Sequence, residues 1–599
     1  MTTPARYDVV VVGGGFAGSL VARALGDGGW RVLVLEAGTD GAEDATHTFQ
    51  TTVAKTPTSA LRANALVPSP DVLDLAGGPG GYTATGYLRQ TGPLPYSSPY
   101  LRVNGGSGTA WTGLVPRMHP DDFGYHGVGR RWPLGYDDLE PYYRAAEREI
   151  GVAADVDEQR EGVGLPFPDG YVFPMHGLPR TYLDDVLAEA LDDREVSDPY
   201  LGGPTSLRVV GTPQARNAPP NRAYDGGRGF RPAGHRCAGY ASCMPVCPEG
   251  AKYTPRRTQA RWPSTVTLRT RAVVHRVARD EHGRVTGVAF RSYEPGSAGR
   301  HTVEEVTADL VVLAAHAVEN ARLLLMSGLA DGSGQVGRNL MDHPALLTWG
   351  LTAAPTGPYR GPGSTTGIEG FRFGPGRRVR APFRIEIGNW GWVWALGPPD
   401  RDVDELLAQN VFGTDLRRRL GERVGRQFAL QFEIEQEADP ANRVTLDPDR
   451  RDAFGDPRPV LHYDLSDYVK RGMAAAKRVS DQIFALLGAE DHTAYRPEPG
   501  MPGYFEFDGT PYAYRGAGHG AGTHLMGASA ADSVVDAWQR SWDHPNLYLV
   551  GCGSMPSLGT SNPSLTMAAL ALRSAEHMDR ELRAARRLTV TDVKENAPS

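Results

Sequence analysis

The sequence has few cysteines, no long apolar run and no excess of basic charge. Four cysteines among 599 residues are too few for a disulfide framework. No run approaches the roughly eighteen apolar residues of a membrane span, and a strand pattern begins almost at the first residue, without the regions of a secretory signal. A net charge of -7 gives no support for binding nucleic acid or an anionic membrane. We therefore expect a cytoplasmic protein whose partners are small molecules.

The chain is long enough to bury a large core. With 40% hydrophobic and 22% charged residues it reads as globular, and its length predicts two or more structural units. The 73 glycines and 47 prolines indicate many ordered turns, because an aromatic content of 9% argues against general disorder.

A glycine-rich turn follows the first apolar run. Residues 7–12 form a largely apolar, β-branched run, "GGGFAG" comes next, and residues 19–25 continue as a helical pattern. In such a strand, turn and helix, Gly13 permits a tight turn, Gly15 lets a pyrophosphate approach the backbone, and Gly18 lets the helix pack against the strand. The sequence therefore predicts a dinucleotide site.

An acidic residue supports this prediction. Glu36 comes at the end of a second predicted strand, residues 31–35, where it can accept hydrogen bonds from a ribose diol. The following residues are Ala37 and Gly38, with no arginine for a 2'-phosphate, so NADP is disfavoured. FAD and NAD both stay open at this point.

Later segments distinguish the two cofactors by resemblance. They include "VGRNLMDHP" (336–344), "GHGAGTHLMG" (518–527) and "NLYLVGCGSMPSLGTSNPSLTMAALALRSAEHM" (546–578). With the first glycine turn, they make the chain resemble the glucose/methanol/choline oxidoreductases, a flavoprotein family. The loop "RVNGGSGTAWTGLVPRMH" (102–119) and the pair Asn562-Pro563 are most similar to the pyranose oxidase branch, which includes bacterial oxidases of sugars and of C-glycosides.

The resemblance implies an α/β fold in which an FAD-binding, Rossmann-like domain joins an antiparallel-sheet substrate domain. We expect a discontinuous FAD domain over 1–345, with insertions at about 50–100 and 130–230 on the substrate side. A substrate domain over 346–510 and a C-terminal FAD segment over 511–599 would follow. The tryptophans at 390, 392 and 394 alternate, which predicts one shared strand face, either as core or as a stacking platform for a sugar.

The second glycine-rich loop is expected to lie against the flavin. Glycines at 105, 106 and 108 would let the flat ring contact main chain. Related enzymes often link the flavin covalently to a histidine, and the matching residue here is Ala110, so the resemblance implies non-covalent FAD. The cofactor-binding residues predicted together are Gly13, Gly15, Gly18, Glu36, Arg102, Asn104, Gly105, Gly106, Gly108, Thr109, Ala110, Trp111, Thr112, Val274, Gly551, Cys552, Pro563 and Thr566.

Two residues match the family's catalytic pair. His519 falls where the family carries its catalytic histidine, and a neutral imidazole suits removal of a hydroxyl proton. Asn562 matches the second member, whose amide can donate to the substrate oxygen. His524 is the rival base in the same segment. For His119, His316 and His343 we expect structural roles.

The expected reaction oxidises a ring secondary alcohol, at C2 or C3 of a pyranose or glycoside, while dioxygen becomes hydrogen peroxide. Two alternatives stay open: a dehydrogenase that uses a quinone or protein acceptor, and a non-redox flavoprotein such as a lyase. Fungal relatives form tetramers, so the resemblance also leaves a homo-oligomer open.

Three cysteines cluster in the sequence. Cys237, Cys243 and Cys247 have the spacing C-x5-C-x3-C. They could ligate an iron-sulfur centre, but three ligands are fewer than four, and reduced thiols suit a cytosolic setting. We therefore predict no metal.

Overall fold

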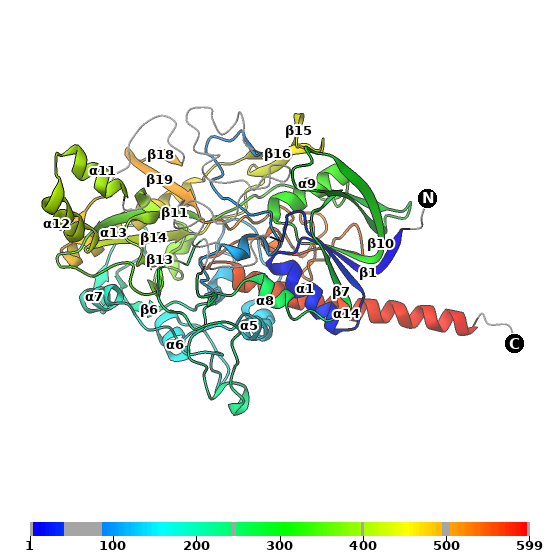
Figure 1. The fold of residues 1–599 in the computed structure, drawn as a ribbon, viewed down its shortest axis with the longest axis horizontal. Helices are drawn as coiled ribbons and strands as arrows, with labels where there is room; N and C mark the ends of the chain where they lie inside the picture. The colour runs from blue at the N-terminus through cyan, green and yellow to red at the C-terminus, as the bar shows by residue number, and fades with distance from the viewer. Residues whose placement is uncertain are drawn as a thin grey trace.

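The computed structural model describes residues 4–40, 87–241, 243–244, 247–396, 400–493 and 503–595. The expected insertion at about 50–100 lies largely outside these described residues. Two sheets organise the described chain, one on each side of the molecule in Figure 1.

The first sheet has the strand order β7-β2-β1-β10-β9-β8, with β20 pairing β10. Its parallel strands are β1 (Ala5–Val12), β2 (Val32–Leu35), β7 (Val266–Arg269), β10 (His301–Leu313) and β20 (Leu547–Leu549), and β8 (Ala272–Arg279) and β9 (Val285–Tyr293) are antiparallel. Residues 9–12 are all buried, as expected for a strand covered on both faces.

Two helices from opposite ends of the chain pack together on this sheet. Side chains of α1 (Phe16–Asp27) and α14 (Ser564–Glu595) share one apolar cluster with β1 and β2. Strands from the start, middle and end of the chain therefore complete one sheet, and the predicted α/β fold is confirmed.

The second sheet has the order β18-β19-β11-β14-β13-β12-β6, with β17 pairing β11. Its strands are β6 (Val209–Gly211), β11 (Pro344–Leu351), β12 (Thr366–Ile368), β13 (Phe383–Gly388), β14 (Gln427–Ile434), β17 (Glu490–Asp491), β18 (Tyr504–Phe507) and β19 (Thr510–Gly516), paired antiparallel. β6 and β19 lie at or beyond the ends of the range 346–510, so this sheet draws on more of the chain than that range.

The two faces of the second sheet differ in chemistry. Ile385 and Phe432 point toward the apolar cluster that includes α13 (Asp467–Leu487). The intervening residues of β13 and β14 are mostly polar, yet Arg384, Glu386 and Glu433 are also buried. An antiparallel sheet with a polar outer face usually turns that face to water. Here it is covered by protein.

The prediction that three tryptophans share a strand face is wrong. β13 ends at Gly388, and Gly391 adopts φ +54 before the short helix α10 (Val393–Leu396) begins. Trp390 and Trp392 are therefore in a turn, and both are buried. Trp392 Nε1 donates to the carbonyl of Gly350 at 3.1 Å, as a core residue would. The side chain of Trp394 lies outside the described part of the chain.

The remaining described elements surround the two sheets (Figure 1). They are α5 (Tyr136–Ile150), α6 (Val156–Val163), α7 (Tyr182–Leu191), α8 (Pro255–Gln259), α9 (Ala317–Ser327), α11 (Asp400–Ala408), α12 (Gly413–Val424), β3 (Arg89–Gln90), β4 (Glu195–Val196), β5 (Thr205–Ser206), β15 (Arg443–Arg451) and β16 (Pro457–His462).

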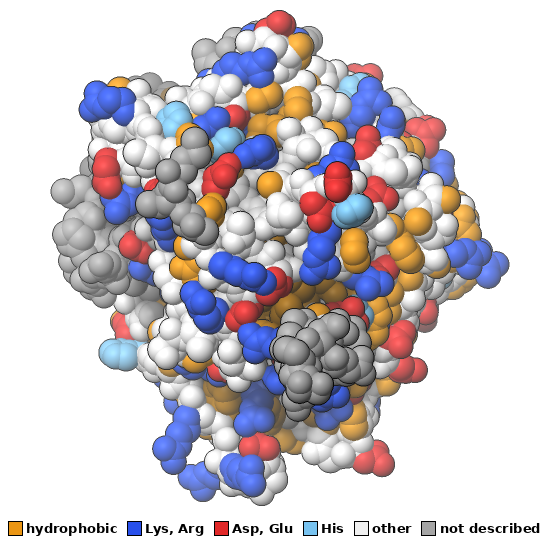
Figure 2. All heavy atoms as spheres, turned by 90° about the vertical axis from the view of Figure 1, so that its right-hand side faces the viewer, with side chains coloured by type: hydrophobic (Ala, Val, Ile, Leu, Met, Phe, Trp, Pro, Cys, Tyr) orange, Lys and Arg blue, Asp and Glu red, His pale blue; other side chains and the backbone are white. Residues whose placement is uncertain are grey.

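Acidic and basic side chains are interspersed over the right-hand side of the molecule, the side on which α14 extends beyond the first sheet (Figures 1 and 2). None of the helices in the described residues is long and apolar enough to cross a membrane.

Candidate active site

The first glycine loop lies at the carboxyl end of β1. Gly13 has φ +104, and a Cβ added at Gly18 would lie 2.0 Å from the Gly13 carbonyl oxygen, so the helix packs as closely as predicted. Gly15 is the N-cap of α1 and offers no capping side chain. A Cβ there would meet no described atom within 4 Å. The first-turn amides of α1 therefore face open space that suits an anion.

Glu36 lies beside this loop. Its two carboxylate oxygens accept hydrogen bonds from the backbone N–H groups of Gly14 and Gly38, both at 2.8 Å. Burial raises the pKa of Glu36, and these hydrogen bonds oppose the rise. The Ala272 N–H, at the start of β8, donates to the Glu36 carbonyl at 2.9 Å. Val274, a predicted cofactor residue, lies two residues further along β8. The carboxylate is thus placed next to the open space at α1.

The second glycine loop packs directly on the first. The Gly105 N–H donates to the Gly14 carbonyl at 3.2 Å, with Gly105 at φ +93. Gln259 on α8 joins the loops, since its Nε2 donates to both the Gly14 carbonyl and Asn104 Oδ1 at 2.8 Å. Sequence reasoning missed Gln259, which belongs to no motif.

The second half of this loop is held by hydrogen bonds and a ring contact to other parts of the protein. Trp111 Nε1 donates to the Tyr253 carbonyl at 2.8 Å, and its ring meets Phe16 edge-on with centroids 5.2 Å apart. Lys252 donates to the Trp111 carbonyl, and Arg216 donates to the Thr112 carbonyl. Ala110 lies between the short 3-10 helix Gly106–Thr109 and Trp111 and offers only a methyl group.

Several other predicted cofactor residues have protein partners. Arg102 is half-buried in an ion pair with Glu319. Burial alone would raise the pKa of Glu319, but Arg102 and Arg322 bring it down to about 2. The Thr566 hydroxyl is within 2.8 Å of the Tyr143 hydroxyl. The side chains of Arg102 and Thr566 are therefore already engaged within the protein.

The segment between β20 and α14 contains three predicted cofactor residues, Gly551, Cys552 and Pro563. Burial raises the pKa of the Cys552 thiol to about 12, so it is protonated, and its Sγ lies 3.6 Å from Met567 Sδ. Pro563 directly precedes α14. The open helix N-terminus, the carboxylate of Glu36 and the stacked glycine loops together fit a flavin dinucleotide: Glu36 would hold the ribose and α1 the pyrophosphate.

Two histidines, His519 and His343, are in direct contact at the predicted catalytic site. His519 Nδ1 and His343 Nδ1 are 2.8 Å apart, and the two rings are perpendicular. His343 Nε2 lies 2.9 Å from the Gly559 carbonyl oxygen. Burial lowers the pKa of His343 to about 4. Burial also lowers the pKa of His519 well below its usual value, with contributions from His343 and Arg384. Both imidazoles are therefore neutral at pH 7.

These contacts assign the protons. A carbonyl oxygen only accepts, so His343 Nε2 carries the hydrogen and its Nδ1 is a lone pair. His519 Nδ1 must then donate to His343. The lone pair of His519 is left on Nε2, which is the state that a general base requires. The structural role expected for His343 is thus replaced by a direct contact with the candidate base.

Asp342 positions the same pair. Its Oδ1 accepts from the backbone N–H groups of His343 at 2.8 Å and His519 at 3.0 Å, and the Ser98 hydroxyl donates to Oδ2. Burial raises the pKa of Asp342 to about 6. One carboxyl group therefore holds the main chain of both histidines.

Asn562 is held by the polar face of the second sheet. Arg384 Nη1 donates to Asn562 Oδ1 at 2.9 Å, and Asn562 Nδ2 donates to Glu433 Oε1 at 2.9 Å. Arg384 also pairs with Glu369 at 3.0 Å and Glu386 at 2.7 Å. These contacts fix which end of the amide is the donor.

Two of these carboxyl groups favour their protonated form. Burial raises the pKa of both Glu386 and Glu433, most strongly for Glu433, which Glu386 raises further; Arg384 opposes both shifts. Because two buried carboxyl groups beside one arginine cannot both ionise easily, we infer that the pair retains a proton at neutral pH.

The other histidines are less suited to proton transfer. His524 is fully buried, its Nε2 accepts from Asn320 Nδ2 at 3.1 Å, and burial lowers its pKa to about 3. His119 caps a short helix through Asp121 N–H at 3.1 Å. The rival base is therefore enclosed, whereas His519 keeps partial exposure.

The three clustered cysteines are free thiols in the structure. Lys252 is fully buried near them, donating to the Cys243 carbonyl at 2.7 Å, and burial lowers its pKa to about 7. Among the residues described, no group of three or more His, Cys, Asp or Glu side chains is arranged around a metal position.

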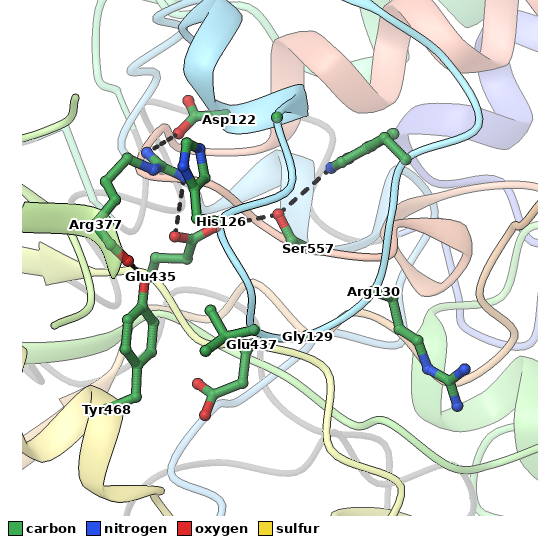
Figure 3. Close-up of a pocket in the computed structure, with 12 residues that line it drawn as sticks. Asp122, His126, Gly129, Arg130, Arg377, Glu435, Glu437, Tyr468 and Ser557 are labelled. Atoms are coloured by element: carbon green, nitrogen blue, oxygen red, sulfur yellow. Dashed lines mark hydrogen bonds and ion pairs between the residues drawn. The ribbon is translucent and has the colours of Figure 1, made fainter. Parts of the chain in front are cut away.

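A cavity is lined by charged and hydroxyl side chains that include Asp122, Arg377, Glu435 and Ser557 (Figure 3). Arg377 joins Asp122 at 2.8 Å to Glu435 at 3.1 Å, and the Ser557 hydroxyl donates to Glu435 at 3.2 Å. Burial raises the pKa of Glu435 to about 7. The Gly559 N–H donates to the Ser557 hydroxyl at 3.3 Å. This network of buried charges therefore reaches the residue whose carbonyl contacts His343.

Comparison with protein families gives three matches. Residues 8–194 match the model described as FAD dependent oxidoreductase. Residues 229–345 and 438–571 match the N-terminal and C-terminal models described as GMC oxidoreductase.

Individual relatives extend the likeness over the whole chain. The fructose dehydrogenase large subunit of Gluconobacter japonicus is 30% identical over 589 residues, covering 96% of this chain and 98% of the relative. C-glycoside 3-oxidase of Microbacterium trichothecenolyticum is 27% identical over 53% of this chain and 55% of its own. The crystal structure of pyridoxine 4-oxidase from "Mesorbium loti" has the same fold, with a TM-score of 0.58 and 18% identity over 95% of this chain and 99% of that one.

Proposed function

Because the chain belongs to the glucose/methanol/choline (GMC) oxidoreductase family of FAD-dependent enzymes, we propose that it oxidises a ring secondary alcohol of a pyranose sugar or glycoside, at C2 or C3, to the ketone. The observation that carries this proposal is the pair of His519, with its lone pair on Nε2, and Asn562, fixed by the buried charges of the second sheet.

His519 is proposed as the base that removes the hydroxyl proton. The proton would reside on Nε2 while the Nδ1–H bond to His343 stabilises the resulting imidazolium. The Asn562 amide hydrogen-bonds both Glu433 and Glu386, and one of its two N–H groups would turn to the substrate oxygen and stabilise charge that develops there. FAD, when bound, accepts the hydride.

We propose that FAD is held without a covalent bond. Ala110 at the position of the flavin-linking histidine supports this, together with Glu36 and the open N-terminus of α1. Acid precipitation tests it: yellow colour is expected in the supernatant, and colour retained on the washed polypeptide would contradict it.

The electron acceptor divides the proposal into two candidates. Dioxygen, reduced to hydrogen peroxide, is the acceptor expected from the pyranose oxidase resemblance. A quinone or protein acceptor is favoured by one observation: the fructose dehydrogenase relative, at 30% identity, is more similar to this chain than the C-glycoside oxidase or the paromamine 6'-oxidase of Streptomyces fradiae, each at 27%. Oxygen-electrode traces with excess sugar, with and without benzoquinone, separate the two.

Two further proposals concern the domain boundaries. The buried polar face supports 346–510 as the core of the substrate domain, with β6 and β19 added at its edges, and β20 and α14 support 511–599 as part of the FAD domain. A cytoplasmic location and a homo-oligomer stay predictions.

The decisive experiment is an anaerobic screen. Purified holoenzyme is mixed with monosaccharides, O-glycosides, C-glycosides and simple alcohols, and flavin absorbance near 450 nm is followed. We expect bleaching by sugars, with a ketone at C2 or C3 in the product. Bleaching by no compound would favour the non-redox alternative and overturn the proposal.

A further inference from the structure

A short buried segment links the catalytic asparagine to the second glycine loop. It spans residues 212–216, and its side chains Thr212, Gln214 and Arg216 are 5%, 1% and 2% exposed. Three polar side chains this deeply buried, at alternate positions of one segment, require partners.

Contacts at the two ends locate the segment. At one end, Arg384 Nη2 donates to the Thr212 hydroxyl at 3.2 Å, and the same guanidinium holds Asn562 Oδ1 at 2.9 Å. At the other end, Arg216 Nη2 donates to the Thr112 carbonyl, in the loop expected to lie against the flavin. The segment therefore runs between the two parts of the proposed active site.

The middle of the segment carries unpaired polar atoms. Gln214 Nε2 donates to the Ser364 carbonyl at 3.0 Å, which brings these two residues together. Among the described residues, Gln214 Oε1, the Ser364 hydroxyl, and Nε and Nη1 of Arg216 have no hydrogen-bond partner. Ser364 is 0% exposed. An acceptor, a hydroxyl and two donors are thus left unpaired along one buried row.

We propose that Gln214, Ser364 and Arg216 form a subsite that hydrogen-bonds the non-reacting hydroxyl groups of the sugar substrate. This inference rests on the proposed function and names the residues that select a polyhydroxylated ring.

The chemistry of the row supports this ligand. Each sugar hydroxyl both donates and accepts, so it can donate to Gln214 Oε1 and accept from Arg216. An alcohol with a single hydroxyl, spent on His519, would leave the row unpaired. A site built to bind hydroxyl groups discriminates strongly against a substrate that lacks them. The competing explanation is an ordered water that bridges the same atoms.

Ser364→Ala is the sharpest test, because it removes a hydroxyl with no partner among the described residues. We expect kcat/KM to fall about 5- to 150-fold for the best sugar of the screen, the range for one unpaired buried group. The melting temperature of the sugar-free holoenzyme should not fall. A bridging water predicts the reverse: a lower melting temperature and unchanged kcat/KM.

Gln214→Leu provides the second variant, measured with the same sugar and its monodeoxy analogues. In the wild type, at least one deoxy analogue should be poorer by a similar factor. In Gln214→Leu, the sugar and that analogue should become equivalent, because the group that read the missing hydroxyl is gone.

Ser480→Ala is the matched control. Ser480 is also buried, but its hydroxyl lies 2.8 Å from Thr348 on the α13 side of the sheet, so its loss should leave the ratio between sugar and deoxy analogue unchanged.

The outcomes separate this proposal from the proposed function. If the wild type bleaches with sugars but both variants keep wild-type kcat/KM and deoxy ratios, the subsite is overturned and the function stands. If only simple alcohols bleach the flavin, or nothing does, the sugar substrate and the subsite both fall.

Discussion

Replacing His343 tests the proton assignment most directly. In His343→Leu, His519 loses the acceptor of its Nδ1–H, a contact of 2.8 Å between the two nitrogens. The contact matters most once His519 becomes an imidazolium, because a hydrogen bond from a charged donor contributes about 1.5–3 kcal/mol. We therefore expect flavin reduction to slow about 10- to 150-fold. His519→Ala, which removes the base itself, should slow it about 10² to 10⁴-fold.

The assay is anaerobic stopped-flow reduction at saturating sugar, with FAD content and melting temperature measured for each variant. His343→Asn is the conservative rescue, because its Oδ1 can accept from His519 where Nδ1 did, and it should recover part of the rate. A reduction rate for His343→Leu within twofold of wild type, in protein that still holds FAD, would refute the tautomer argument. So would an Asn variant no better than Leu.

Three further predictions follow from the same geometry. Because burial lowers the pKa of His519 well below 6.5, kcat/KM should stay flat as pH falls through 6.5 and decline only at lower pH, where the neutral base is lost; a pH profile with an acidic limb centred at 6.5 or above would contradict this. Gly15→Ala adds a methyl group where no described atom lies within 4 Å, so the apoprotein should keep its melting temperature. FAD affinity, measured by fluorescence titration, should drop at least about tenfold because the methyl group occupies the expected pyrophosphate position. Unchanged affinity would count against pyrophosphate binding there. Arg384→Met leaves Glu386 without its buried cation and Glu369 with Arg372, and should destabilise the protein by about 3–5 kcal/mol in urea unfolding. A loss under about 1 kcal/mol would show that Glu386 is neutral without Arg384.

Local motifs were the part of the site most accessible to sequence reasoning. The turn at Gly13 and the close packing at Gly18 were predicted from one short stretch of sequence, and in the structure Gly13 has φ +104 and Gly18 packs against the Gly13 carbonyl. His343 and His519 lie 176 residues apart in the sequence, and no local motif marks their contact. Only a structural role was therefore expected for His343. Gln259 was missed for the same reason.

Alternation of residue types was a weaker guide. In "FRIEIG" it correctly indicates a strand with one polar face, but it cannot tell whether that face meets water or a second domain. For the tryptophans, alternation gave a wrong strand, because β13 ends at Gly388 and the backbone turns before α10, with Gly391 in the left-handed region. The α/β fold was predictable because the apolar strands of the first sheet are buried on both faces.

The joining of α1 to α14 and of β10 to β20 has a consequence for biosynthesis. While the ribosome is still translating, the nascent chain holds β1, β2 and β10 but lacks the strand and helix that cover them, which come only after residue 546. The first sheet thus stays incomplete until residues beyond 546 have emerged from the ribosome, and its apolar edge is uncovered meanwhile. Stable flavin binding is then expected only after β20 and α14 have joined this sheet.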